Sequence, residues 1–261
     1  MATKVMLDID GVLTVSWRPL PGAVDTVRWL RAHGIEFRLV TNTSSKSRAQ
    51  IAELLEQAGI EVGADQIQTA VSSAARFLRD TYPGAACFFL NEGDVGSDLE
   101  GVDLVGPADA EVVLLGGAGP GVGYTEVDAV FKRAIEGVPL VALHRNTRFQ
   151  TDGGPALDMG AFIVGLEAAA AVEVPVVGKP AASFFGSALR SLQAEPATTV
   201  MVGDDLASDV LGAQAVGIGG VLVRTGKFRP SDLEGSSGQP DQVIDDIGQL
   251  PGLLDQLPQA G

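Results

Sequence analysis

The chain has 261 residues, of which 46% are hydrophobic, and 33 acidic residues against 18 lysines and arginines give it a formal net charge of −15. At roughly 100–200 residues per domain, this length allows one large globular domain or two modest ones. The acidic balance argues against a nucleic-acid partner held through phosphate contacts, and the single cysteine, Cys87, excludes an intramolecular disulfide and a multi-cysteine zinc site.

Neither a membrane span nor a secretory signal is expected. The most apolar region, residues 161–177, is interrupted by Glu167, Glu173 and Pro175. It therefore falls short of the roughly 18 uninterrupted apolar residues that a membrane-spanning helix needs. The first residues lack the charged and apolar regions of a secretory signal. We therefore expect a cytoplasmic protein with no membrane partner.

Short β-rich runs alternate with segments of helical periodicity at the start of the chain. Residues 5–8 and 37–40 are predicted strands. Between them, the apolar stripe from Val24 to Leu30 predicts a helix that ends at Gly34. A second apolar stripe at residues 51–58 predicts the next helix. This is the alternation expected of strand–helix–strand units.

The middle of the chain, about residues 75–175, has a strand and helix alternation of its own. We predict strands at residues 87–90, 112–115 and 140–143, and helices near residues 125–135 and 159–171. The glycine-rich patches at 116–121 and 151–155 are predicted loops, and the first lacks the Gly-Lys-Ser/Thr ending of a nucleotide-binding phosphate loop. Because about 100 residues suffice for a small domain, we predict that 75–175 is inserted into a domain formed by 1–74 and 176–261.

The alternation continues in the last third of the chain. Predicted strands lie at residues 174–177, 199–202 and 220–223, and predicted helices at 184–192 and 206–215. Strands that alternate with helices along a chain are typical of a parallel sheet covered by helices. The sequence therefore predicts an α/β fold.

Polar residues follow four of the predicted strands. Residues i and i+2 of a strand point to the same side, so Asp8 and Asp10 can place two carboxylates together after the first strand. The other three strand ends carry Thr41-Asn42, Lys179, and the acidic group Asp204, Asp205 and Asp209. Because open α/β sheets bind ligands at the carboxyl ends of their strands, we expect these side chains to form one site.

The residue types at these strand ends indicate metal-assisted phosphate chemistry. Three or four carboxylates around one point need a cation, and hard oxygen ligands select Mg²⁺. A threonine hydroxyl, an asparagine amide and a lysine ammonium are suitable donors to phosphoryl oxygens. A carboxylate that attacks such a phosphoryl group forms an aspartyl-phosphate intermediate, which divides one difficult displacement into two.

Four segments resemble, in order and spacing, the motifs of the haloacid dehalogenase (HAD) superfamily. They are Asp8-Ile9-Asp10-Gly11-Val12-Leu13-Thr14, Val40-Thr41-Asn42, Gly178-Lys179-Pro180, and Gly203-Asp204-Asp205 with Asp209. The resemblance implies a Rossmann-like core, and the long insertion between the second and third motifs resembles the C2-type cap of class IIA. Residues 177–185 and 223–230 resemble the subgroup that contains phospholysine phosphohistidine inorganic pyrophosphate phosphatase.

The resemblance implies a role for each motif residue. Asp8 would be the nucleophile and a Mg²⁺ ligand, and Asp10 would act as general acid and then general base, with its backbone carbonyl on the metal. Thr41 and Asn42 would hold the phosphoryl group. Lys179 would neutralise both that group and Asp8. The presence of Asp10 favours phosphoryl hydrolysis, because members that displace halide need no acid at that position.

The remaining candidates lie in the fourth motif and in the predicted cap. The resemblance makes Asp204 a Mg²⁺ ligand, with Asp205 and Asp209 in supporting positions around it. Arg145 and Asn146 follow a predicted cap strand and are candidate substrate-binding residues. Solvent-exposed loop residues are the alternative interpretation of this pair.

These observations predict a Mg²⁺-dependent phosphohydrolase that acts on small phosphorylated molecules: phosphomonoesters, pyrophosphate or P–N phosphates. Two alternatives remain open, a non-enzymatic phosphoacceptor and a HAD scaffold that has lost catalysis. A phosphoacceptor receiver domain needs only about 120 residues in one flavodoxin-like unit, whereas this chain carries a predicted cap as well. The class IIA resemblance also implies a homodimer.

Overall fold

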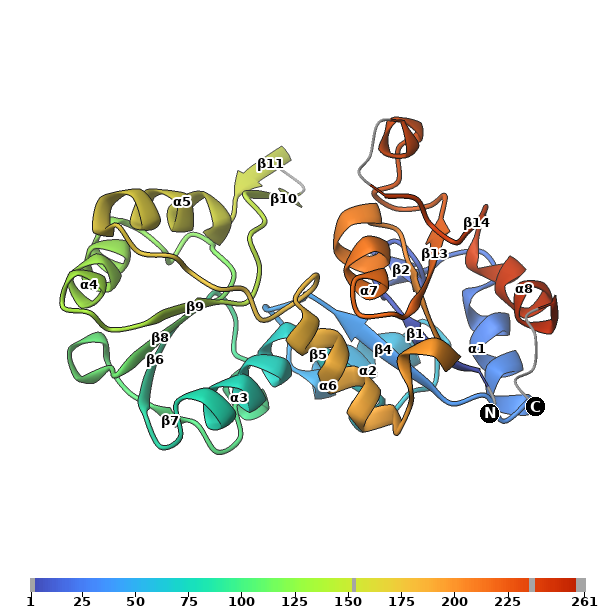
Figure 1. Cartoon of the computed structure of the whole chain (residues 1–261), viewed down its shortest axis with the longest axis horizontal. Coiled ribbons are helices and arrows are strands. Elements are labelled where there is room, and N and C mark those ends of the chain that lie inside the picture. The colour runs from blue at the N-terminus through green and yellow to red at the C-terminus, as the bar shows by residue number, and fades with distance from the viewer. Residues whose placement is uncertain (1–2, 152–153, 235–237, 257–261) are drawn as a thin grey trace. The chain divides into compact units, whose positions relative to one another are not determined.

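The computed structural model of the chain describes residues 3–151, 154–234 and 238–256. The chain divides into two compact units (Figure 1). The first comprises Met1–Thr41, Arg48–Gln68 and Lys179–Gly261, and the second comprises Asn42–Ser47 and Thr69–Gly178. The second unit thus has a short segment at 42–47 and a long one at 69–178, whereas the predicted inserted domain spans 75–175. Each unit contains its own parallel sheet, which confirms the predicted α/β fold.

The sheet of the first unit has six strands in the order β14-β13-β12-β1-β4-β5. The strands are β1 (Lys4–Leu7), β4 (Phe37–Thr41), β5 (Ile67–Thr69), β12 (Thr199–Gly203), β13 (Gly219–Val223) and β14 (Gln242–Ile244). The central strand β1 is parallel to both neighbours, with Met6 paired to Met201 on one side and to Arg38 on the other. The carboxyl ends of β12, β1 and β4 are therefore adjacent at one edge.

Helices cover both faces of this sheet (Figure 1). They are α1 (Ala23–Ala32), α2 (Arg48–Gln57), α6 (Ala182–Leu192), α7 (Gly212–Gln214) and α8 (Leu250–Gln256). Val5 and Leu7 of β1 pack in one core cluster with residues of α1, α2 and α8, whereas Met6, between them, packs with residues of α6 and α7. A strand whose side chains are buried on both faces is hydrophobic, as residues 5–7 of β1 are.

The second unit has a four-stranded parallel sheet in the order β7-β6-β8-β9. Its strands and helices are β6 (Ala86–Leu90), β7 (Asp103–Leu104), β8 (Val112–Leu115), β9 (Leu140–Ala142), α3 (Ala70–Thr81), α4 (Tyr124–Ile135) and α5 (Met159–Ala170). Val112 and Leu114 pack in the core cluster that contains residues of α3. Val113 and Leu115 pack with residues of α4 and α5 on the other face. This unit therefore has helices on both faces too.

Two hairpins and several short turns complete the structure. The hairpins pair β2 (Thr14–Val15) with β3 (Arg18–Pro19) and β10 (Arg148–Thr151) with β11 (Gly154–Leu157), both antiparallel. Short 3-10 turns lie at Ala64–Gln66, Gly96–Asp98, Pro107–Asp109, Pro196–Thr198, Pro230–Leu233 and Ile247–Gln249. Across the described ranges, every helix is too short or too polar to cross a membrane.

Two sequence predictions about local structure were wrong, and a third was right in type but not in detail. Residues 174–177 form no strand and make only an isolated bridge between Val176 and Ala142, since Pro175 lacks the N–H that a ladder needs. The predicted loop at 151–155 includes ends of the hairpin strands β10 and β11, with residues 152–153 outside the described ranges. The predicted helix at 206–215 is confirmed as helical, but in two forms: Leu206–Leu211 is a π-helical turn, and α7 follows it.

Candidate active site

The predicted site residues of the first unit lie where its central strands end. Asp8 follows β1 directly, Thr41 is the last residue of β4, and Asp204 follows β12. The backbone N–H of Asp8 donates to the carbonyl of Val202 at 2.9 Å, so hydrogen bonding to β12 continues through this residue. These three residues are almost completely buried, with exposed fractions of 4% at Asp8, 3% at Thr41 and 1% at Asp204.

Lys179 joins two of the buried carboxylates. Its ammonium lies 2.8 Å from Asp8 Oδ1 and 2.7 Å from Asp209 Oδ1, and it also donates to the carbonyl of Val40 at 3.4 Å. Burial alone would lower the pKa of Lys179, but the carboxylates of Asp209 and Asp8 outweigh burial and raise this pKa above its ordinary value. The lysine is therefore a permanent cation at neutral pH, fixed between the two aspartates.

Asp204 is the carboxylate with an unused oxygen. Its Oδ2 accepts a hydrogen bond from the backbone N–H of Lys227 at 2.6 Å. Its Oδ1 is buried and has no hydrogen-bond partner among the residues that the structure describes. Burial, and next the charge of Asp8, raise the pKa of Asp204 to about 7. Such a group needs a cation to remain ionised at neutral pH.

Two glycines approach Asp204 so closely that no other residue fits. Gly11 has φ +88° and Gly226 has φ +59°, in the left-handed region that favours glycine. A Cβ atom at either position would lie 1.9 or 2.0 Å from Asp204 Oδ2, respectively. The two loops are also joined directly, because the Thr225 hydroxyl donates to the carbonyl of Gly11 at 2.5 Å.

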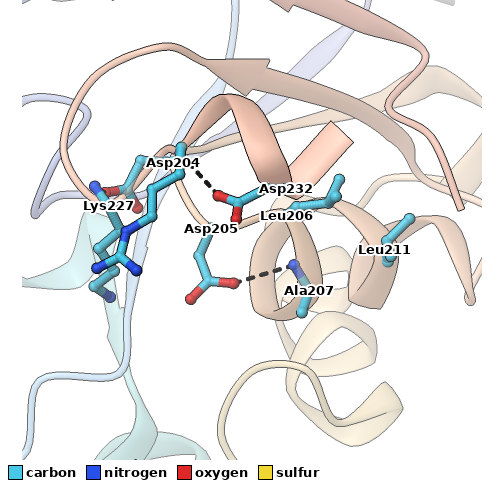
Figure 2. A pocket seen from close by; sticks show the side chains of 8 residues that line it. Asp204, Asp205, Leu206, Ala207, Leu211, Lys227 and Asp232 are labelled. Carbon is cyan, nitrogen blue, oxygen red and sulfur yellow. Dashed lines mark hydrogen bonds between the residues drawn. The ribbon is translucent and has the colours of Figure 1, made fainter. Parts of the chain in front are cut away.

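The acidic residues around Asp204 are positioned by the π-helical turn. Asp205 begins the turn. Its Oδ1 accepts a hydrogen bond from the backbone N–H of Ala207 at 3.1 Å (Figure 2) and another from the backbone N–H of Ser208 at 3.0 Å. Asp209 lies four residues further on, and its Oδ2 accepts from the backbone N–H of Asp205 at 3.3 Å. Its Oδ1 thereby reaches Lys179. Burial raises the pKa of Asp209, while Lys179 limits the rise.

Three carboxylates are close enough to share one metal ion. Asp8, Asp204 and Asp209 each offer an oxygen, and these oxygens lie within 4.8 Å of one another. Asp10 is more exposed than this trio. Partial burial of its carboxyl raises the pKa of Asp10, and the neighbouring charge of Asp8 raises it further. A raised pKa suits a carboxyl that must both donate and accept a proton.

The other predicted site residues belong to the second unit. Asn42 follows Thr41 in the chain, and a Cβ atom on Gly178 would lie 2.6 Å from its Oδ1. Arg145 is an ion-pair partner of Glu167 and also donates to the carbonyl of Val174 at 3.3 Å. Asn146 is exposed, and its backbone N–H donates to His144 Nδ1 at 3.3 Å. The guanidinium of Arg145 is thus already engaged within its own unit.

Sequence reasoning missed one charged residue of the site. Lys227 follows β13, the strand beside β12, and its positive charge acts on Asp8, Asp10 and Asp204. The signal was present, because the Thr225-Gly226-Lys227 segment follows a correctly predicted strand. The expectation that polar residues at the ends of parallel strands form one site applies equally to this segment.

The fold and the site define a haloacid dehalogenase-like hydrolase. The family model for haloacid dehalogenase-like hydrolases matches residues 5–105, and a second HAD-hydrolase-like model matches residues 176–250. The chain is 34% identical over 230 residues to the human haloacid dehalogenase-like hydrolase domain-containing protein 2, covering 88% of this chain and 87% of the relative. The chain belongs to this family.

Named phosphatases are among its relatives. The human phospholysine phosphohistidine inorganic pyrophosphate phosphatase is 32% identical over 256 residues, covering 96% of this chain and 93% of that protein. The structure is also similar to p-nitrophenyl phosphatase from Archaeoglobus fulgidus, with a TM-score of 0.89, 28% identity, and coverage of 98% of this chain and 100% of the other. These findings confirm the predicted superfamily and the prediction of a phosphatase.

Proposed function

We propose that this phosphatase is Mg²⁺-dependent and acts through an aspartyl-phosphate on Asp8. The observation that carries the proposal is the position of Lys179, which lies within 2.8 Å of both Asp8 Oδ1 and Asp209 Oδ1 in a buried site. This contact pairs the Asp8 carboxyl with a buried cation and fixes its orientation. A carboxylate held in a fixed orientation is what a nucleophile requires.

The residues present fit a magnesium ion. Asp204 Oδ1 is a buried oxygen without a partner in the described part of the chain, and Asp8 and Asp209 offer two further carboxylates nearby. We propose Asp8, the backbone carbonyl of Asp10 and Asp204 as ligands, with Asp205 and Asp209 holding the surrounding geometry. When bound, the ion would offset the charge of the carboxylates and of the transferring phosphoryl group.

The chain's own residues account for both half-reactions. In the first, an oxygen of Asp8 forms a bond to phosphorus, the bond to the leaving group breaks, and Asp10 gives its proton to the leaving atom. In the second, Asp10 takes a proton from water, the water oxygen bonds to phosphorus, and the Asp8–phosphorus bond breaks to release phosphate. Thr41, Asn42 and Lys179 would hold the phosphoryl oxygens.

The substrate class we propose is small phosphorylated molecules, including phosphomonoesters, pyrophosphate and P–N phosphates. The relatives support this range, since they include a p-nitrophenyl phosphatase and a phospholysine phosphohistidine inorganic pyrophosphate phosphatase. Three expectations stay predictions: substrate binding by Arg145 and Asn146, the homodimer, and a cap role for the second unit.

The test is hydrolysis of p-nitrophenyl phosphate and pyrophosphate with Mg²⁺ or with a chelator, by wild type and Asp8→Asn. We expect Mg²⁺-dependent turnover in wild type and a loss on the order of 10⁴-fold or more in the variant. Circular dichroism should show that Asp8→Asn remains folded. Appreciable turnover by Asp8→Asn would overturn the mechanism. Phosphorylation of wild type without release of phosphate would indicate a phosphoacceptor, and no reaction with any substrate would indicate a scaffold without catalysis.

A further inference from the structure

A pocket of about 420 Å³ adjoins the carboxylate cluster of the first unit. The π-helical turn forms one side, and the loop that follows β13 forms the other. Its charged lining residues are Asp204, Asp205, Lys227, Arg229 and Asp232 (Figure 2). Because Asp204 belongs to both the pocket and the proposed metal site, a molecule in this pocket would lie beside that metal site.

The three acidic residues of the pocket already have local partners. Asp204 Oδ2 accepts from the backbone N–H of Lys227, and Asp205 Oδ1 accepts from the two N–H groups that begin the π-helical turn. Asp232 Oδ2 accepts from the backbone N–H of Arg229 at 2.8 Å (Figure 2). Hydrogen bonds from backbone N–H groups stabilise a carboxylate charge. Asp205 and Asp232 are therefore engaged by the local backbone, and the second oxygen of Asp204 belongs to the proposed metal site.

The two cations of the pocket are not engaged in this way. Within residues 3–151, 154–234 and 238–256, the ammonium of Lys227 and the guanidinium of Arg229 make no ion pair or hydrogen bond. Both side chains are solvent-accessible. A solvent-exposed lysine is charged at neutral pH. An arginine remains charged at any physiological pH.

We propose that Lys227 and Arg229 form a subsite for an anionic group on the leaving portion of the substrate. The subsite would favour molecules such as pyrophosphate, in which the leaving group is itself a phosphate, over esters with an uncharged leaving group. Guanidinium and ammonium groups are effective phosphate ligands because their hydrogen bonds are charge-assisted. The inference deepens the proposed function and rests on it, because it concerns the specificity of the same site.

The two cations would act on binding and on charge, without a proton transfer of their own. In pyrophosphate hydrolysis, Asp8 forms its bond to one phosphorus, and the bridging P–O bond breaks with its electron pair on the leaving phosphate. Asp10 supplies the proton that the bridging oxygen takes. Lys227 and Arg229 would offset the negative charge that the leaving phosphate carries and gains.

The kinetic test compares two substrates across matched variants. The kcat/KM for pyrophosphate, divided by that for p-nitrophenyl phosphate, is measured in wild type, Lys227→Met, Arg229→Met and the double variant. We expect the ratio to fall by about tenfold or more in the double variant, since two charge-assisted hydrogen bonds are lost. Lys227→Arg should retain most of the ratio. Arg224→Met is the matched control, because Arg224 is an exposed cation three residues away that pairs with Asp245.

A binding measurement tests the subsite without turnover. Calorimetry with Mg²⁺ compares methylenediphosphonate, which has two anionic groups, with methylphosphonate, which has one. The double variant should lose affinity for the first ligand and keep its affinity for the second. Equal losses for both ligands, or an unchanged kinetic ratio, would overturn the subsite.

The outcomes separate this inference from the proposed function. Wild type that turns over p-nitrophenyl phosphate, with a kinetic ratio unaffected by the variants, refutes the subsite alone. Wild type that accepts p-nitrophenyl phosphate and excludes pyrophosphate refutes it as well. Wild type without hydrolysis of either substrate refutes the proposed function, and the calorimetry then still decides whether the two cations bind a second anionic group.

Discussion

Both units place polar side chains at the carboxyl ends of parallel strands, but these side chains have different roles in the two units. In the first unit, the strand ends carry Asp8 and Asp204, whose carboxylates are directed at Lys179 or at one another. In the second unit, β6 ends before Asn91, whose amide donates to the carbonyls of Ser44 and Gly93 at 2.9 and 3.2 Å. The Asn91 Oδ1 accepts from the N–H of Gly117 at 2.8 Å.

Two buried aspartates make the difference explicit. Asp158 of the second unit is 6% exposed, and its Oδ1 accepts from the N–H groups of Ala118 and Met159 at 3.0 and 2.8 Å. It therefore closes a loop and caps α5. Asp204 of the first unit is 1% exposed and has an oxygen with no partner in the described residues. A strand end brings polar groups together, but chemistry needs groups that the backbone has not already engaged.

The largest effect should come from removing the charge that joins the first unit's carboxylates. Lys179→Met leaves Asp8 and Asp209 buried without their cation, so we expect loss of activity and of about 3–5 kcal/mol in the free energy of unfolding at pH 7. Urea denaturation measures the second effect. Lys132→Met is the control, since the Lys132–Asp128 pair on α4 of the second unit is exposed and should leave the unfolding midpoint unchanged. A stable and active Lys179→Met protein would contradict the proposed site.

Two asparagine variants compare the buried aspartates directly. Mg²⁺ should raise the melting temperature of wild type, because a ligand that binds the folded state stabilises it. Asp204→Asn should abolish most of that shift. Asp158→Asn keeps an Oδ1 that can accept from the N–H groups of Ala118 and Met159, and asparagine caps helices as well as aspartate does. This variant should therefore change the melting temperature little and keep the full shift with Mg²⁺. Equal responses of the two variants to Mg²⁺ would remove the distinction between the units.

The pH dependence of the metal-free protein should identify the unsatisfied carboxylates. The pKa of Asp204 rises from 3.8 to about 7 on folding, so the folded state binds more protons than the unfolded state between these values. Stability must therefore fall as the pH rises from about 4 towards 7. Melting curves in chelator should show this decline, Mg²⁺ should oppose it near neutral pH, and Asp204→Asn should flatten it. A stability that rises over this interval in wild type would contradict the assignment.

A smaller effect is expected from Asn91. Asn91→Ala leaves the Gly117 N–H and the Ser44 carbonyl without their partner, which should cost about 1–3 kcal/mol. Hydrogen exchange should become faster at Gly117 and in residues 42–47. Asn91→Asp keeps the acceptor of the Gly117 N–H and should protect that amide better than alanine does. Unchanged exchange in Asn91→Ala would show that this side chain does not hold the loop.

The sequence was sufficient to predict the elements whose side-chain pattern is strong. Strand β1 and helix α6 have continuous or regularly spaced apolar residues, and both lie close to the predicted bounds. Helix α3 was missed because most of its residues from Ala70 to Ala75 are small, although the helix has a buried apolar stripe and Thr69 and Ser72 cap it reciprocally. The Gly-Pro pair in β11 similarly concealed the second hairpin.

The site was predictable as a set of strand ends and unpredictable in its details. Spacing could bring Asp8, Lys179 and Asp204 to one edge of a sheet, because parallel strands end together. It could not show that residues 206–211 form a π-helical turn that directs Asp209 toward Lys179. Nor could it show that Lys227 and Arg229 face a pocket while their neighbouring acids are engaged. These features depend on contacts between segments distant in sequence.

The close approach of Gly11 and Gly226 to Asp204 has a consequence for genetics. Neither glycine has a side chain to contact a substrate, yet a single added methyl group at either position would collide with the same carboxylate oxygen. A saturation library selected for growth on a phosphorylated nutrient should therefore tolerate substitutions at these two positions as poorly as at Asp204 itself. Survival counts alone would then identify positions that shape the site, including residues that take no part in the reaction.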